Sequence, residues 1–183
     1  RRLANFLRSK YDCLLTTSKT INDDNPLLNC RVEGLEKKSP DLIILDRFLN
    51  IKKNSAALEV KNRKIYILTN AKNISKEKFL KNKGVKIVKI NRVNLYKNNL
   101  KNVFYLIKKL GFSRILVESG VTFLDQLIKH KLIKNFYLFK SSENLGTKGI
   151  NRSNLLYSKK IFFFEKNKIK VNLKDDSLYK VKI

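Results

Sequence analysis

Residues 114–132 have the sequence RILVESGVTFLDQLIKHKL, which predicts a strand, a tight turn and a helix. The aliphatic run at 115–117 is typical of a buried parallel strand. Gly120 ends that run. The apolar residues after it recur every three or four positions, which places them on one face of a helix. These apolar residues are Phe123, Leu124, Leu127 and Ile128.

The turn at Gly120 has the features of an anion-binding site. A glycine between the carboxyl end of a strand and the start of a helix leaves free backbone N–H groups that suit a phosphate. Thr122 lies at the start of the helix, and Glu118, two residues before the glycine, could hold hydroxyls or amines of a ligand. Most such turns only connect elements, however. The chain also lacks the G-x-G-x-x-G fingerprint, so a standard Rossmann nucleotide site is not supported.

Elsewhere, short apolar runs alternate with helical patterns between residues 41 and 140. This alternation predicts an α/β fold with a mostly parallel central sheet flanked by helices. Segments 159–174 and 177–183 predict an antiparallel C-terminal edge. No linker or repeat interrupts the chain, so a single domain over 1–183 is expected. The other predicted strands are 11–17, 41–47, 64–70, 85–90 and 135–141, and the other predicted helices are 2–10, 75–82 (capped by Ser75) and 95–110.

Residues 18–31 form a polar stretch that is rich in turn-forming and cap-forming residues. Leu27 and Leu28 within it suggest that the segment is pinned to the core and fixes Arg31 in position. A simple capped turn explains the same pattern equally well, so both interpretations stay open.

The formal net charge of +26 raises the question of a nucleic-acid partner. The positive residues are spread over the whole length, with no dense basic arm and no interleaved aromatic platform. Compositional drift towards lysine therefore explains the charge better than a dedicated nucleic-acid site. We expect only nonspecific nucleic-acid binding at low salt.

Several other classes of protein are disfavoured by composition. Two cysteines and one histidine do not provide a disulfide scaffold, a zinc site or a Ser–His–Asp triad, so no metal is expected. There is no apolar run long enough to span a membrane, and no signal-peptide pattern is visible. We therefore expect a cytoplasmic protein. Because the chain begins without methionine, it is expected to be a fragment of a longer chain or a processed product.

Four segments, in the right order, resemble the riboflavin-biosynthesis reductase domain. TINDDNPLLNCR (20–31) is similar to its T-x-x-x-D-D-P-x-L-x-x-R segment, and residues 115–139 are similar to its V-E-[AG]-G-x-T segment with the following helix and strand. Residues 1–20 resemble the segment that leads into the first motif, and 41–47 resemble a strand ending in Asp and a polar residue. That domain is the C-terminal half of a bifunctional pyrimidine deaminase and reductase.

The resemblance implies a dihydrofolate-reductase-like fold, NADPH as hydride donor and usually a homodimer. It also implies reduction of the ribosyl group of 5-amino-6-(5-phosphoribosylamino)uracil to a ribityl chain. The resemblance assigns no catalytic residue, and Glu118, Asp24 and water are equally plausible proton donors. The positions that match the family's substrate contacts are Arg8, Leu28, Arg31 and Glu118. The positions that match its cofactor contacts are Thr20, Asp24, Arg47, Gly120, Val121, Thr122, Phe123 and Leu124.

The chain departs from the family pattern within its motifs. Asn25 stands where the family usually has a second Asp, and Val121 where it often has Pro. The first strand of the reductase domain and the zinc deaminase half, with its H-x-E and P-C-x-x-C signature, are also expected to be missing. Two alternatives remain, which are another pterin or pyrimidine reductase of the same fold and a basic nucleic-acid-binding module.

Overall fold

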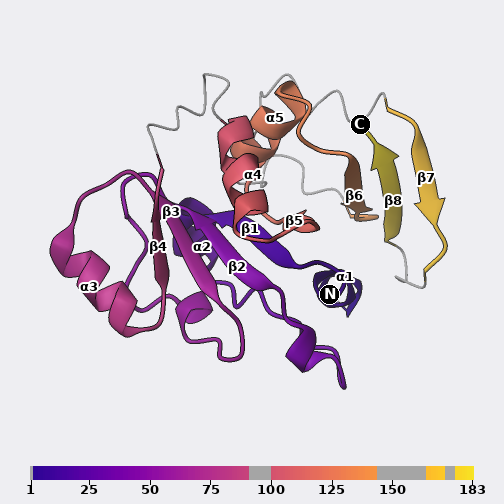
Figure 1. Cartoon of the computed structure of the whole chain (residues 1–183). Coiled ribbons are helices and arrows are strands. Elements are labelled where there is room, and N and C mark those ends of the chain that lie inside the picture. The colour runs from indigo at the N-terminus through magenta and orange to yellow at the C-terminus, as the bar shows by residue number, and fades with distance from the viewer. Residues whose placement is uncertain (1, 91–99, 144–163, 172–175) are drawn as a thin grey trace. The chain divides into compact units, whose positions relative to one another are not determined.

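The computed structural model of the chain describes residues 2–90, 100–143, 164–171 and 176–183 (Figure 1). It divides into two compact units, Arg1–Gly120 and Val121–Ile183. Two predicted segments lie partly outside the described residues, namely the helix at 95–110 and the strand segment 159–174. That residues 1–183 form a single domain stays a prediction.

The first unit contains a five-stranded sheet in the order β4-β3-β2-β1-β5 (Figure 1). All four strand pairs are parallel, which confirms the predicted parallel sheet. β1, β2 and β3 are buried along almost their whole length, as expected for strands that are covered on both faces. The strands are β1 (Cys13–Thr17), β2 (Asp41–Leu45), β3 (Ile65–Thr69), β4 (Lys86–Lys89) and β5 (Ile115–Val117).

Four α-helices and two short 3-10 helices connect these strands among the described residues of the first unit. The helix predicted at 75–82 begins one residue earlier, and its cap is Asn73 rather than Ser75, because the Asn73 side chain accepts the Lys76 N–H at 3.0 Å. The helices are α1 (Arg2–Arg8), α2 (Ser18–Asp24), η1 (Glu36–Lys38), η2 (Ala56–Leu58), α3 (Ile74–Asn82) and α4 (Leu100–Lys109).

The main core of the first unit fixes α2 against the sheet. Leu14, Ile44 and Ile67 come from β1, β2 and β3, and they pack with Ile21 of α2 and Leu80 of α3. All five side chains are fully buried. Burying an aliphatic side chain contributes about 1.5–3 kcal/mol, so this cluster holds α2 at the carboxyl end of β1.

The second unit contains helix α5 and a three-stranded antiparallel sheet in the order β6-β8-β7. Ile128 of α5 and Val181 of β8 form the centre of its apolar cluster. The antiparallel pairing of β7 with β8 confirms the predicted antiparallel C-terminal strands. β6, which the sequence placed in the mostly parallel part of the fold, instead pairs antiparallel with β8 in this separate sheet. The elements are α5 (Val121–Lys129), β6 (Asn135–Lys140), β7 (Lys166–Ile169) and β8 (Ser177–Lys182).

Asp12 joins the start of β1 to the start of β5 within the first unit. Its carboxylate accepts the N–H groups of Ser113 at 3.1 Å and Arg114 at 2.8 Å, and it pairs with the Arg114 guanidinium at 2.8 Å. The backbone N–H of Arg114 is the largest cause of a lowered pKa for Asp12. The carboxylate form therefore stabilises this junction of the two strands.

Asp12→Asn is expected to lower the free energy of unfolding by about 1–2 kcal/mol at neutral pH. Because the pKa of Asp12 is lower in the folded than in the unfolded chain, its stabilisation is present above the unfolded pKa of about 4 and is lost as the pH falls through the folded pKa. Urea unfolding from neutral to acid pH measures the difference between variant and wild type. A difference that stays constant down to the acid limit would contradict the assignment.

Candidate functional site

A cluster of hydroxyl groups lies at the carboxyl ends of β1 and β5. Leu15 is paired with Val117, so the residues that follow these two parallel strands lie at one edge of the sheet. The hydroxyl oxygens of Thr17, Thr20 and Ser119 lie 3.0–3.3 Å from one another. The Gly120 N–H donates to Thr20 Oγ1 at 3.2 Å. The structure thus brings Thr20 and Gly120, two of the predicted cofactor residues, into direct contact.

Two members of this hydroxyl cluster were missed by sequence reasoning. Thr17 is the N-cap of α2 and accepts the Thr20 N–H at 3.3 Å, a role that its position before a polar run could have indicated. Ser119 occupies the position where the family motif has Ala or Gly. Nothing in its local sequence predicts that its hydroxyl meets the end of β1.

Arg8 and Glu118 form a bidentate ion pair between α1 and the end of β5. Arg8 Nε lies 2.8 Å from Glu118 Oε1, and Arg8 Nη2 lies 2.7 Å from Glu118 Oε2. The Arg8 side chain is 11% exposed and the Glu118 side chain 28%. Such a fork with two parallel N–H···O bonds is among the stronger charge pairs in proteins.

The pair changes what these two predicted substrate residues can do. Both carboxylate oxygens of Glu118 accept from Arg8, so the carboxylate has no proton to donate. Because the Glu118 side chain is 28% exposed, its remaining lone pairs can accept from a ligand. The Arg8 fork is occupied by Glu118, and its third nitrogen, Nη1, donates to the Asn29 carbonyl at 3.0 Å.

Residues 25–31 follow α2 in a conformation held by side chains of α1 and of the chain beyond. Leu28 has a φ of 53°, in the left-handed region that a leucine rarely adopts, and its side chain is buried in the core. The Cys30 N–H donates to Ser39 Oγ at 3.0 Å, and the Arg31 N–H donates to Asn5 Oδ1 at 3.2 Å. The predicted pinning by the leucines is therefore correct for Leu28, whereas Leu27 is 38% exposed.

Arg31 is exposed at the end of this loop, in contrast to Arg8. Within the described part of the chain, no hydrogen bond or ion pair joins its guanidinium to another group. A free, exposed guanidinium on a fixed backbone suits the bidentate binding of a phosphate.

Asp24 and Arg47 follow the neighbouring strands β1 and β2, Asp24 at the end of α2 and Arg47 soon after β2. Asp24 ends α2 and is exposed. The next residue, Asn25, adopts a left-handed conformation, and its Oδ1 accepts the Ala56 N–H at 2.8 Å. Asn25 thus supplies the acceptor oxygen that the family's Asp would also supply. Arg47 follows β2 and lies over the Phe48 ring, 5.0 Å from its centroid, and its Nε has no partner among the described residues.

The other predicted cofactor residues, Val121, Thr122, Phe123 and Leu124, form the start of α5 in the second unit. Leu124 packs in the apolar cluster of that unit. Among the residues that the structure describes, no three His, Cys, Asp or Glu side chains gather in a way that could hold a metal ion. None of the described helices is long and apolar enough to cross a membrane.

Comparison with known families identifies the domain to which these motifs belong. The model of the RibD C-terminal domain matches residues 1–178. The chain belongs to the RibD C-terminal domain family. The resemblance predicted from the two motifs is thereby confirmed.

Two curated proteins illustrate the relation of this RibD C-terminal domain to longer chains. It is 28% identical to the riboflavin biosynthesis protein RibD of Aquifex aeolicus, with the match covering 80% of this chain and 39% of that protein. It is also 28% identical to the 5-amino-6-(5-phosphoribosylamino)uracil reductase of Buchnera aphidicola, over 76% of this chain and 70% of that protein. The chain therefore spans well under half of the Aquifex protein.

Solved RibD structures share the fold. One form of Acinetobacter baumannii RibD superposes with a TM-score of 0.74 at 17% identity, over 100% of this chain and 49% of that chain. A deaminase/reductase from Thermotoga maritima superposes with a TM-score of 0.69 at 16% identity, over 100% of this chain and 48% of that chain. The predicted dihydrofolate-reductase-like α/β fold is confirmed by these likenesses.

Proposed function

We propose that the chain reduces the ribosyl group of 5-amino-6-(5-phosphoribosylamino)uracil to a ribityl group, with NADPH as the reductant. The observation that carries the proposal is the joining of the two family motifs at one sheet edge. The first motif supplies Thr20 and the second supplies Ser119 and Gly120, while Arg8 pairs with Glu118 beside them. One curated relative is named for this reductase, which supports the substrate class.

The proposed substrate contacts divide into two kinds. The Glu118 carboxylate, oriented by Arg8, accepts hydrogen bonds from amines or hydroxyls of the substrate. Arg31 holds the 5′-phosphate through its unoccupied fork. Leu28 contributes through its fixed backbone, because its side chain is buried in the core.

The residues present at the edge fit a dinucleotide phosphate. A Cβ atom added at Gly120 would meet no atom within 4 Å, so the backbone there is open to an approaching group. The hydroxyls of Thr20 and Ser119 offer donors to phosphate oxygens. Arg47 follows β2, and its Nε is buried, so we propose that its terminal guanidinium nitrogens meet the 2′-phosphate of the adenosine. NADPH supplies a hydride when bound.

The side chains mainly orient the substrate and leave proton transfer to solvent. In the proposed reaction, hydride adds to C1′ of the ring-opened ribosyl group, and a proton is taken up at the nitrogen. Glu118 accepts from Arg8 through both oxygens, so it orients the substrate and does not donate this proton. Asp24 is exposed on α2, and we therefore propose water as the proton donor.

The test is a fluorescence titration with NADPH at an ionic strength of about 0.15 M, with NADH as the control. Saturable binding that favours NADPH, followed by NADPH oxidation on addition of the phosphoribosylaminouracil, is the expected result. Turnover with a different pterin or pyrimidine and not with this substrate would point to another reductase of the same fold. Absence of NADPH binding and turnover would sink the proposal.

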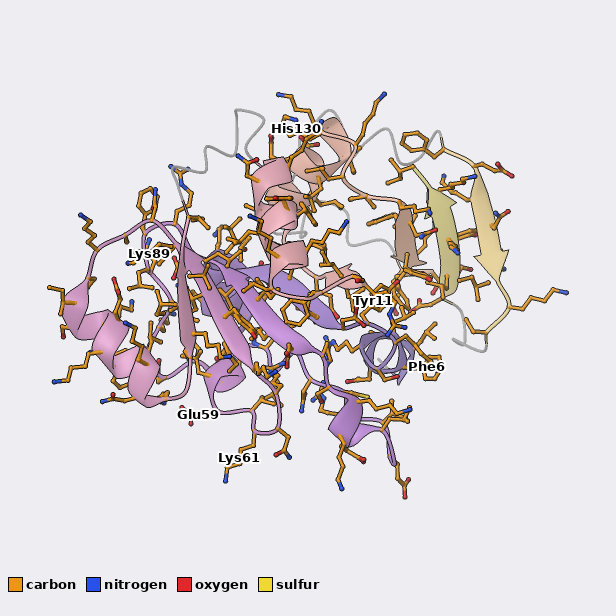
Figure 2. All side chains as sticks on the ribbon, viewed as in Figure 1. Phe6, Tyr11, Glu59, Lys61, Lys89 and His130 are labelled. Carbon is orange, nitrogen blue, oxygen red and sulfur yellow. The ribbon has the colours of Figure 1, made fainter. Side chains whose placement is uncertain are left out.

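Arg47→Ala is expected to weaken NADPH binding about tenfold to a hundredfold while leaving NADH binding nearly unchanged. The reason is that only NADPH carries the 2′-phosphate that this guanidinium would meet. The same titration measures both effects. Lys61→Ala is the matched control, because Lys61 is exposed, precedes β3 at the opposite end of the sheet and extends away from it (Figure 2). An equal loss for NADPH and NADH would remove Arg47 from the phosphate site.

A homodimer in the cytoplasm, as the family resemblance implies, belongs to the same proposal. Sedimentation velocity at several protein concentrations tests the oligomeric state. Nucleic-acid binding is proposed to be nonspecific, so it should be lost steeply as salt rises to about 0.15 M. High-affinity binding that survives at that salt would instead favour a nucleic-acid-binding module.

A further inference from the structure

Arg63 lies outside every motif that the sequence analysis singled out, between η2 and β3. Its guanidinium donates to three backbone carbonyl oxygens. Nη1 lies 2.7 Å from the Leu28 oxygen, and Nη2 lies 2.8 Å from the Leu27 oxygen and 2.9 Å from the Ala57 oxygen. One side chain thereby connects the loop after α2 to the segment before β3.

The charge of Arg63 has no direct carboxylate partner among the described residues. Burial, with the nearby Arg8 as a second cause, lowers the pKa of Arg63 to about 10, so it remains charged at neutral pH. A partly buried cation whose hydrogen bonds go to carbonyls is costly because it gives up water, and the charge of Asp41, which forms no direct ion pair with it, offsets this in part. Such a group is worth examining for a role beyond stability.

Arg63 and Arg8 together hold three consecutive carbonyls of the loop. Arg63 binds the oxygens of Leu27 and Leu28, and Arg8 Nη1 binds the oxygen of Asn29 at 3.0 Å. Leu28, in the middle, has the positive φ of 53° that its surroundings must impose. Two arginines from different elements thus fix the carbonyls of the loop, and Arg31 follows two residues after Asn29 with its guanidinium exposed.

We propose that Arg63 is a positioning residue, which holds the loop at Leu27 and Leu28 so that Arg31 is presented to the substrate's phosphate. This inference rests on the proposed function. Arg63 itself touches neither substrate nor cofactor, and acts through the loop backbone.

The test compares Arg63→Lys, which keeps the charge but loses the fork, with Arg63→Gln, which loses both. For both variants, the KM of the phosphorylated substrate is expected to rise roughly tenfold to a hundredfold, as for a misplaced binding group. The kcat and the NADPH affinity should change little, and a dephosphorylated substrate should show a much smaller rise. Lys61→Gln, two positions away and exposed, is the charge-matched control.

A second readout needs no substrate. Hydrogen exchange of the Cys30 and Arg31 amides, which donate to Ser39 and Asn5, should be faster in Arg63→Lys by roughly tenfold. The amides of Leu14 and Ile43, in the core strands, should exchange as in the wild type. Faster exchange throughout the protein with parallel losses in KM, kcat and NADPH affinity would show a general structural role and overturn the proposal.

If Arg63→Lys keeps the wild-type KM while Arg63→Gln raises it, the charge alone is sufficient, and the role of the guanidinium fork is overturned. An unchanged KM together with unchanged loop exchange would overturn the inference altogether. If the wild-type protein shows no turnover, the proposed function fails. This failure can be told apart from failure of the positioning role, because it is seen before any variant is made. In that case the hydrogen-exchange rates of the Cys30 and Arg31 amides decide whether Arg63 positions the loop. Unchanged rates in the Arg63 variants overturn the positioning role, and faster rates support it.

Discussion

Replacing Glu118 with glutamine is expected to lower kcat/KM for the proposed substrate about a hundredfold and the free energy of unfolding by about 2–3 kcal/mol. Glutamine has the same shape but no charge, and its amide N–H₂ would face the donors of Arg8. Arg8, whose side chain is 11% exposed, would be left without its counter-ion. NADPH affinity should stay nearly intact, because Glu118 contacts substrate in the proposed site. Steady-state kinetics, NADPH titration and urea unfolding measure the three quantities.

A double-mutant cycle separates the interaction free energy of the Arg8–Glu118 pair from the effects of each residue on its other neighbours. Arg8→Met alone should also destabilise the fold, and the double variant should lose less than the sum of the two single losses. Glu59→Gln is the matched control, since Glu59 forms an exposed ion pair with Lys83 and its side chain is 61% exposed (Figure 2). Such surface pairs contribute about 0–1 kcal/mol. Additive losses at Arg8 and Glu118, or unchanged turnover in Glu118→Gln, would contradict the assigned role.

The strands could be predicted from the sequence because burial on both faces leaves a continuous apolar run. β2 and β3 are of this kind, as is the apolar part of β1. Helix α2 could not be predicted in this way, since only Ile21 of its seven residues is buried. It forms because Thr17 caps its start and Asn25 ends it in a left-handed conformation, and both contacts depend on local geometry more than on apolar periodicity.

The candidate site was predicted as a set of positions but not as a set of contacts. Glu118 and Arg8 were each named from a motif, yet their ion pair joins residues 110 positions apart and follows from the fold alone. Asn25 departs from the family pattern in a way that the structure explains, because its Oδ1 still accepts a backbone N–H. Arg63 belongs to no motif, and a lone arginine before a strand gives no signal that it will meet a distant loop.

Replacing Arg31 with alanine is expected to cost on the order of 2–4 kcal/mol of substrate binding, as for other lost contacts between charged groups. The guanidinium is exposed and has no partner among the described residues, so its removal should leave the stability of the fold nearly unchanged. The KM for the phosphorylated substrate and the urea midpoint measure these two effects. Lys37→Ala, an exposed charge in η1 on the same connection, is the control for net charge.

The dephosphorylated substrate decides what Arg31 binds. If the guanidinium holds the phosphate, wild type and Arg31→Ala should bind that substrate with similar affinity, whereas an equal loss with both substrates would argue for a contact elsewhere. The same variant also tests whether Arg63 acts through Arg31. Because Arg63 is proposed to act only through Arg31, adding Arg63→Lys to Arg31→Ala should raise the KM little further, so the two losses should be strongly non-additive. Independent losses would mean that the loop carries a second substrate contact besides Arg31.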